Sequence, residues 1–314
     1  MLFRSQSPQF KVVQLEEYDS KGDVRKYIDT NLIELKEMIS FEDEEEMEKT
    51  GLVLGEAAGG LFIWASTAIQ MIKDNIGNYQ PTLEKLTSTK SLSLGHLYSV
   101  ALRDALAWND KMKELFRDVF GLILFGKEQM TDDVIDGILG MKKGRTGAML
   151  SCLRALVIYQ RGKPIRLHHT SFYDYLTNTE ISSEGWFINA NESKRKIAEQ
   201  CFIGMDKMLH FNMCNLESLY VVNRDVVGLQ ERVQNYIPLF LQYICRYWSN
   251  HLQDTPYSDG MRDALKGFTY NHLLFWLEVM SVTNTLDTRG GSILTHAISW
   301  IGVRLLNYPP TYFN

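Results

Sequence analysis

The stretch that most constrains the fold is residues 163–176, KPIRLHHTSFYDYL, where a short β pattern runs into two histidines and a helix start. Before it, residues 150–160 (LSCLRALVIYQ) show an amphipathic helical pattern followed by a second short β run. Residues 160–163 separate the two β runs and include Gly162, which is typical of a turn. Helix, strand, turn and strand together predict a small β-hairpin beside a helical bundle, as in a winged helix.

Helical periodicity dominates the rest of the chain. Apolar residues recur at helical spacing in segments 19–36, 51–72, 91–108, 114–125, 191–209, 237–252 and 270–282. Thr131 precedes two aspartates and an apolar run, which predicts a helix N-cap. Tyr243, Tyr247 and Trp248 fit a core between antiparallel helices better than a ligand cage. The predicted fold is mainly α, with multi-helix bundles and a winged-helix domain containing one small β-hairpin.

Composition excludes several classes of protein. With 45% hydrophobic residues the chain can bury a large core, so it is not a disordered polymer. A net charge of −5 argues against a dedicated nucleic-acid binder. The longest apolar run, residues 61–72, contains Ser66, Thr67 and Gln70 and is too short to cross a bilayer. We therefore expect no membrane partner and a cytoplasmic location.

The cysteines favour neither disulfides nor a metal site. Cys152, Cys201, Cys214 and Cys245 lie far apart, form no CxxC pair and fall within apolar helical patterns. This spacing predicts buried free thiols in a reducing compartment.

No motif in the sequence predicts catalysis. The chain contains no GxSxG, HExxH or EF-hand loop, and no complete Walker A motif. Gly59 and Gly60 lack a preceding strand, and the basic loop at residues 142–147 is one residue short of Walker spacing without its lysine. His168 and His169 are adjacent, so strand geometry points them to opposite faces, and a pair with Asp174 is conceivable but disfavoured. We expect no catalytic residue and no metal site.

An ordered set of phrases carries a resemblance to a known family. The chain resembles the C-terminal half of the nucleotide-binding module of fungal NACHT-type STAND NTPases, NLR-like proteins related to vegetative-incompatibility factors. The matching phrases are VVQLEEYDSKGDVRKYI, GGLFIWASTAIQMI, LGHLYSVAL, VFGLILFGKEQMTDDVIDGIL, LSCLRALVIYQRGKPIRLHHTSFYDYL, WFIN with AEQCFIGM, YICRYWSNHL and LLFWLEVMS. They follow the family's order and cover nearly the whole chain.

The resemblance implies an order of four parts. Residues 1–18 would hold the last strand of a nucleotide-binding core, in 10–15, and residues 19–108 a helical lid. Residues 109–190 would form the winged helix, and residues 191–314 the helical connector that precedes a sensor domain in such proteins.

The resemblance also implies a nucleotide-sensing residue. His169 matches the histidine of the family's Met-His-Asp-like motif, which in relatives reaches a phosphate of bound ADP and holds the resting state. Thr170 stands here in place of the motif's aspartate, a departure from the full switch. His168 and Arg166 are weaker candidates for the same role.

Function then follows as an expectation. Walker A, Walker B and the sensor arginine would lie before Met1, so this chain would need a separate P-loop domain to hold ADP or ATP, and it would carry no cofactor itself. We expect a non-catalytic regulatory part of a signalling NTPase, of the kind linked to innate immunity and heterokaryon incompatibility. Its partners would be proteins, either a P-loop core or a second copy, and the unpaired strand at residues 10–15 would favour self-association.

Three other interpretations stay open. The chain could be a stand-alone helical adaptor with its own partner, or a gene-model fragment of a longer protein. A winged-helix nucleic-acid binder is disfavoured, because the helix after Thr170 carries Asp174 and no Lys or Arg through Thr179.

Overall fold

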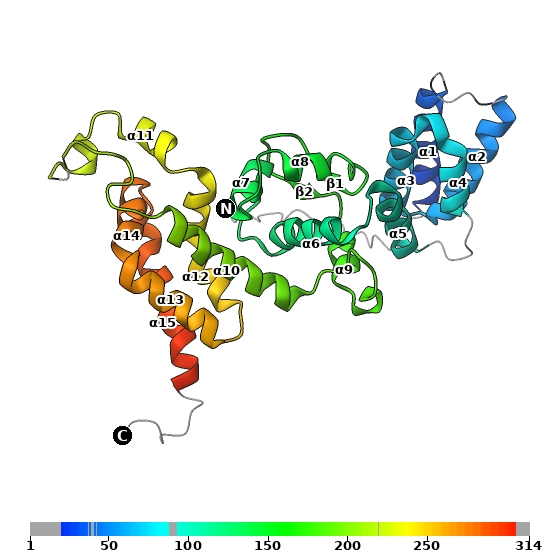
Figure 1. Cartoon of the computed structure of the whole chain (residues 1–314). Coiled ribbons are helices and arrows are strands. Elements are labelled where there is room, and N and C mark those ends of the chain that lie inside the picture. The colour runs from blue at the N-terminus through cyan, green and yellow to red at the C-terminus, as the bar shows by residue number, and fades with distance from the viewer. Residues whose placement is uncertain are drawn as a thin grey trace, which may run out of the picture. The chain divides into compact units, whose positions relative to one another are not determined.

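The computed structural model describes residues 20–36, 38, 41, 43–87, 93–218 and 220–305. Within them the chain forms fifteen α-helices and one antiparallel pair of two-residue strands (Figure 1). The predicted mainly-α class is therefore confirmed. The strand expected at residues 10–15 lies outside the described residues.

The chain divides into two compact units, Met1–Ala101 and Leu102–Asn314. The division falls inside α5, whereas the sequence placed a boundary after residue 108. The boundary expected after residue 190 stays a prediction. The helix that begins there, α10 (Ala190–Met208), packs against both α6 (Asp110–Phe125) and α12 (Leu239–Gln253).

The regular elements of the first unit, among its described residues, are helices. Its helices are α1 (Lys21–Leu35), α2 (Glu44–Ala58), α3 (Phe62–Asp74), α4 (Tyr79–Thr87) and the larger part of α5 (Leu94–Ala105). α1, α2 and α3 pack on one another, and α4 adds to α2 and α3. Their shared core includes Val24, Ile28, Leu54 and Trp64.

A glycine pair separates α2 from α3. Gly59 and Gly60 have φ of +57° and +89°, a conformation that glycine adopts without strain. The Gly60 carbonyl accepts a hydrogen bond from the Ser20 hydroxyl at 2.5 Å. The prediction of a single helix across residues 51–72 is therefore wrong. The first part of this segment belongs to α2, and residues 62–72 belong to α3. Asp43 caps α2 by accepting from the Glu46 amide, and Glu44, Glu45 and Glu46 lie in its first turn.

The second unit contains the hairpin and the other helices. Its remaining elements are α7 (Asp132–Ile138), α8 (Arg145–Leu150), β1 (Val157–Ile158), β2 (Arg166–Leu167), α9 (Thr170–Thr177), α11 (Leu229–Tyr236), α13 (Asp259–Asn271), α14 (Leu273–Val282) and α15 (Gly291–Leu305). α12 contacts α7, α10, α14 and α15. The core of the unit therefore surrounds α12.

The predicted hairpin is present, but the helix before it lies earlier than expected. β1 and β2 pair antiparallel, with Val157 opposite Leu167 and Ile158 opposite Arg166. The Lys163 amide donates to the Gln160 carbonyl at 2.9 Å and closes the predicted turn. α8 ends at Leu150, where the sequence suggested that a helix begins, and it uses part of the basic loop at residues 142–147.

The aromatic residues of α12 form core, as the sequence predicted. Tyr243 and Trp248 are 1% exposed, and Tyr247 is also buried. Trp248 packs against Phe268 and Trp276, whose ring centroids lie 4.9 and 6.2 Å away. The single helix predicted over residues 270–282 is instead the end of α13 and all of α14.

The cysteine prediction is correct for three of the four thiols. Cys201, Cys214 and Cys245 are buried, whereas Cys152 is exposed and free. Cys152 lies in the turn after α8, beyond the end of the helix that was expected to bury it. Among the described residues, no helix has the length and apolarity that crossing a membrane requires.

Candidate functional site

The hairpin presents the three residues that the sequence singled out. Arg166 lies in β2, His168 follows the strand, and His169 immediately precedes α9. All three are exposed. They are thus close along the chain at one end of the hairpin, yet they make different contacts.

His168 is tied to the backbone. Its Nε2 lies 3.0 Å from the Arg154 carbonyl oxygen. A carbonyl only accepts, so Nε2 carries the ring proton and donates it. The His168 amide also bonds the Leu156 carbonyl at 3.2 Å. These two bonds fasten the end of β2 to the segment before β1, which gives His168 a structural role.

His169 is the N-cap of α9. Its Nδ1 accepts from the Ser171 amide at 3.1 Å and lies 2.7 Å from the Ser171 hydroxyl. Because Nδ1 is an acceptor, the proton of the neutral imidazole resides on Nε2. Nε2 has no hydrogen-bond partner within the described chain. The ring therefore offers one outward N–H donor, fixed in position by the cap.

The two weaker possibilities differ from His169. Arg166 is paired in register with Ile158 on the exposed face of the hairpin and forms no ion pair within the described chain. Asp174, the conceivable partner of His169, shares no hydrogen bond with it in the part of the chain that is described. The arrangement can bind an anion through the outward N–H of His169.

A separate cavity of about 460 Å³ lies where α6, α7 and α10 meet. Leu122, Ile138 and Ile197 contribute its buried apolar lining. Its charged lining includes Glu114, Arg117, Asp118, Glu192 and Lys196. The volume lies in the range of small-molecule sites, and none of the three predicted residues lines it.

Lys196 contacts two of the carboxylates that line this cavity. Its Nζ lies 2.6 Å from Asp118 Oδ1 and 3.9 Å from Glu114 Oε1. Burial raises the pKa of the Asp118 carboxyl above its usual value, although the contact with Lys196 opposes that shift. Glu114 and Glu192 add to the rise through repulsion. Asp118 is thus a carboxyl whose charge is costly in its surroundings.

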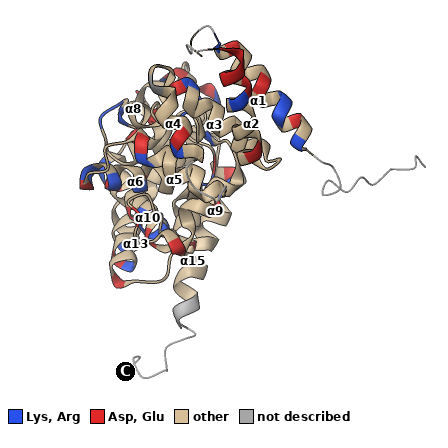
Figure 2. Ribbon diagram, turned by 90° about the vertical axis from the view of Figure 1, so that its right-hand side faces the viewer, with Lys and Arg blue, Asp and Glu red and all other residues tan. Residues whose placement is uncertain are grey.

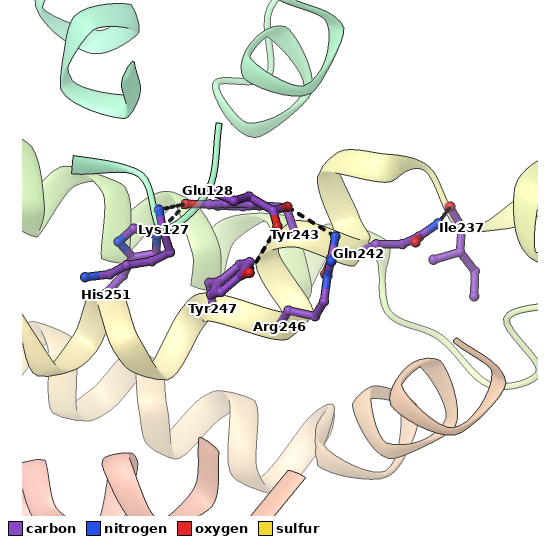
Figure 3. A network of polar contacts seen from close by, with 8 residues as sticks. All are labelled: Lys127, Glu128, Ile237, Gln242, Tyr243, Arg246, Tyr247 and His251. Carbon is purple, nitrogen blue, oxygen red and sulfur yellow. Dashed lines mark hydrogen bonds and ion pairs between the residues drawn. The ribbon is translucent and has the colours of Figure 1, made fainter. Parts of the chain in front are cut away.

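A polar network joins α12 to the loop after α6 (Figure 3). The Tyr243 hydroxyl accepts from the Lys127 amide at 3.0 Å and lies 2.8 Å from His251 Nε2. Burial, with a further effect of Lys127, lowers the pKa of His251 to about 4. The imidazole is therefore neutral at physiological pH, and its Nε2 can accept the phenol proton.

The outer half of the network is ionic. The Tyr247 hydroxyl donates to Glu128 Oε2 at 3.0 Å, and Arg246 Nη2 lies 3.3 Å from Glu128 Oε1. Lys127 Nζ pairs with Asp254 Oδ2 at 2.5 Å. These contacts hold residues 127 and 128 on α12, so the network fastens the end of α6 to the core.

Sequence reasoning missed the cavity, although part of its signal was present. Glu114 and Asp118 are four residues apart on α6, and Glu192 and Lys196 are four apart on α10, so each pair shares a helix face. Nothing in the local pattern indicates that these two faces meet.

Neither a search for metal ligands nor comparison with known proteins assigns a function to the described residues. Within the described ranges, no three His, Cys, Asp or Glu side chains come together as a metal site. Comparisons of the chain with protein-family models, curated proteins and solved structures give no match.

Proposed function

We propose that this chain is a non-catalytic regulatory part of a STAND-type signalling NTPase that acts through protein contacts in the cytoplasm. In this proposal, residues 109–190 form the winged helix, and His169 senses a nucleotide held by a P-loop domain. The fungal proteins that the sequence resembles act in innate immunity and heterokaryon incompatibility, and we propose the same setting here.

The geometry of His169 is the observation that carries the proposal. Its Nδ1 accepts from the Ser171 amide, so its Nε2–H is an exposed donor with a fixed direction. An N–H held in this way can donate to a phosphate oxygen with little loss of side-chain entropy. His168 lacks this property because its Nε2 is bonded to Arg154.

The proposed role through protein contacts has separate support. A group of exposed apolar residues follows α10 and precedes α11: Phe211, Tyr220, Val221, Val222 and Val227. Tyr220 is 100% exposed and Val227 is 91% exposed. Large exposed apolar groups are typical of protein-binding surfaces.

The proposal excludes catalysis by the chain alone. Phosphoryl transfer needs a phosphate cradle, a magnesium ligand and a positioned water, and the sequence contains no Walker motif to supply them. The purified chain should therefore hydrolyse no ATP. Turnover above that of a His169→Ala variant would contradict this part of the proposal.

The nucleotide-sensing role can be tested in source cells. The tagged chain would be recovered with its partners, and ADP released by acid would be measured for the wild type, His169→Ser and His210→Ser. Serine keeps an N-cap acceptor but does not reach outward, whereas His210 is an exposed histidine remote in sequence from the hairpin. We expect ADP with the wild type and His210→Ser, and a clear loss with His169→Ser.

The stand-alone adaptor is the second candidate. Equal ADP in all three samples, or recovery of partners without a P-loop protein, would reject nucleotide sensing. The second of these outcomes would favour the adaptor, since the exposed apolar group would then serve an unrelated partner.

A further inference from the structure

One segment of this acidic chain contains only positive charges. Between Asp136 and Asp174 there is no Asp or Glu. The same segment holds seven cationic side chains: Lys142, Lys143, Arg145, Arg154, Arg161, Lys163 and Arg166. The whole chain has a formal charge of −5, so this segment has a charge of the opposite sign. In Figure 2 the ribbon around α8 carries some of these blue positions.

The seven cations face solvent and are largely unneutralised. Each of them is exposed. Lys143 Nζ pairs with Asp133 Oδ2 at 2.9 Å, and the other six form no ion pair within the described ranges. Unpaired cations that lie within a Debye length of one another produce a positive potential at the surface.

The aspartates of α7 hold two basic loops against the same helix. Asp136 accepts from the Gly144, Arg145 and Thr146 amides at 2.6, 3.2 and 2.9 Å. Asp132 accepts from the Gly162 amide at 3.0 Å and from the Tyr159 hydroxyl at 2.8 Å. The loop before α8 and the hairpin turn are therefore brought together on α7.

These carboxylates are directed away from solvent. Asp132 and Asp136 are 1% and 2% exposed, so their charges are taken up by backbone N–H groups and a phenol. Burial and the bond to Asp132 raise the pKa of Tyr159 to about 12. The cations of the two loops are exposed around them, and the half-exposed Asp133 pairs with one of these cations, Lys143.

The surface extends along the hairpin to its other end. Arg166 is opposite Ile158 on the exposed face, whereas Val157 and Ile165 are buried beneath. Arg154 belongs to the same end, since its carbonyl accepts the His168 bond. We call the seven cations together the basic hairpin surface.

We propose that the basic hairpin surface binds the phosphate backbone of double-stranded nucleic acid without sequence specificity. Its composition decides among classes of partner. Ile158 is the large apolar residue exposed in this surface, at 42%, whereas a protein interface needs a desolvated apolar core. Protein–DNA interfaces are polar and strongly positive instead. A membrane surface would also need an apolar anchor.

The same composition favours a duplex over a single strand. Single-strand sites stack bases on exposed aromatic rings. Tyr159, which lies between the two basic loops, is not fully exposed, and its hydroxyl is bound to Asp132. Helix α9, which begins at Thr170, lacks cations, whereas the basic residues lie before it, on the α7–α8 loop and the hairpin. The inference does not rest on nucleotide sensing by His169.

The charge of the rest of the chain limits the expected affinity for a duplex. The surface holds seven of the 33 Lys and Arg, and the 38 Asp and Glu all lie outside residues 137–173, although Asp133 pairs with Lys143 of the surface. Long-range attraction is therefore weak, and binding depends on short-range contacts and on salt. Backbone binding of this kind has a Kd of roughly micromolar or weaker at physiological salt.

The test measures fluorescence anisotropy of a labelled DNA duplex about two helical turns long, over a series of salt concentrations. The test variant combines Lys142→Gln, Arg145→Gln, Arg161→Gln and Lys163→Gln. It leaves His169 and Arg166 unchanged, so its outcome is independent of the nucleotide proposal. We expect at least tenfold weaker binding and a salt slope smaller by about 0.9 for each phosphate that the variant no longer neutralises.

The matched control removes four exposed cations outside the surface, as Lys111→Gln, Lys207→Gln, Arg224→Gln and Lys266→Gln. It changes net charge equally and should bind within about twofold of the wild type. Equal loss in both variants would overturn the proposal, because net charge alone would then govern binding. Tighter binding of polyglutamate or of phosphatidylserine vesicles than of the duplex would also overturn it. Circular dichroism of both variants would check that each is folded.

Discussion

His169 accepts a hydrogen bond at Nδ1 from the Ser171 amide, 3.1 Å away, and so a histidine caps α9. An N-cap acceptor contributes about 0.5–2 kcal/mol. We expect His169→Ala to lower the free energy of unfolding by about 1 kcal/mol, and His169→Ser to lower it by only a few tenths. Urea unfolding of the two variants measures the difference, and equal losses would show that the cap contributes nothing.

Asp136 should be among the costliest carboxylates to neutralise. It is buried and accepts three amide bonds from the start of α8. Asn can replace one acceptor oxygen but sets its NH₂ against the other amides, so Asp136→Asn should destabilise by about 2–4 kcal/mol. Asp133→Asn, which breaks a pair with the exposed Lys143, should cost under about 1 kcal/mol. Denaturant unfolding compares the two, and similar losses would reject the capping role.

His251 should make stability depend on pH below neutrality. Its pKa falls from 6.5 to about 4 on folding, so the unfolded chain binds the proton more readily. Stability is therefore complete above about pH 6.5 and declines as pH falls toward 4, by up to about 3 kcal/mol. His251→Gln should remove this dependence between pH 6.5 and 4, whereas His210→Gln should keep it. An unchanged slope in His251→Gln would contradict the assignment.

Two glycine-to-alanine substitutions should change stability in opposite directions. A Cβ at Gly137 would meet the Phe240 side chain at 2.4–2.8 Å, so Gly137→Ala should destabilise by about 1–3 kcal/mol. A Cβ at Gly267, within α13, meets nothing within 4 Å. Gly267→Ala should therefore stabilise by about 0.5–1 kcal/mol. Thermal unfolding measures both changes in stability. Stabilisation by Gly137→Ala would show that α7 and α12 are not in close contact.

One thiol should react rapidly in the native chain. Cys152 is exposed, whereas burial raises the pKa of Cys201 to about 12 and also raises that of Cys245. A thiol reagent should modify one cysteine quickly and the others only after unfolding. Cys152→Ser should abolish the fast phase. A fast phase that persists in this variant would mean that a core cysteine is accessible.

Local sequence signals predicted those features whose causes are local. The Thr131 cap and the turn at residues 160–163 follow from hydrogen bonds between near neighbours. The inward positions of α12 follow from helical periodicity, since Tyr243 and Trp248 are buried as expected. The mainly-α class rests on the same periodicity repeated along the chain.

Errors arose where a distant residue decides the local structure. The start of α8 is fixed by Asp136, which lies on another helix and caps its first amides. Cys152 is exposed because α8 ends at Leu150, so the helix that should have buried it has already terminated. Neither effect is visible in a window of neighbouring residues.

By itself, the sequence determined that the chain is mainly helical, where its hairpin lies and that His169 stands between a strand and a helix. Tertiary structure decided which of the two histidines keeps an outward donor, since that depends on the Arg154 carbonyl and the Ser171 amide. It also decided that α6 and α10 enclose a cavity and that two basic loops meet on α7. Spacing along a chain fixes which face of an element a side chain occupies, but packing fixes what that face meets.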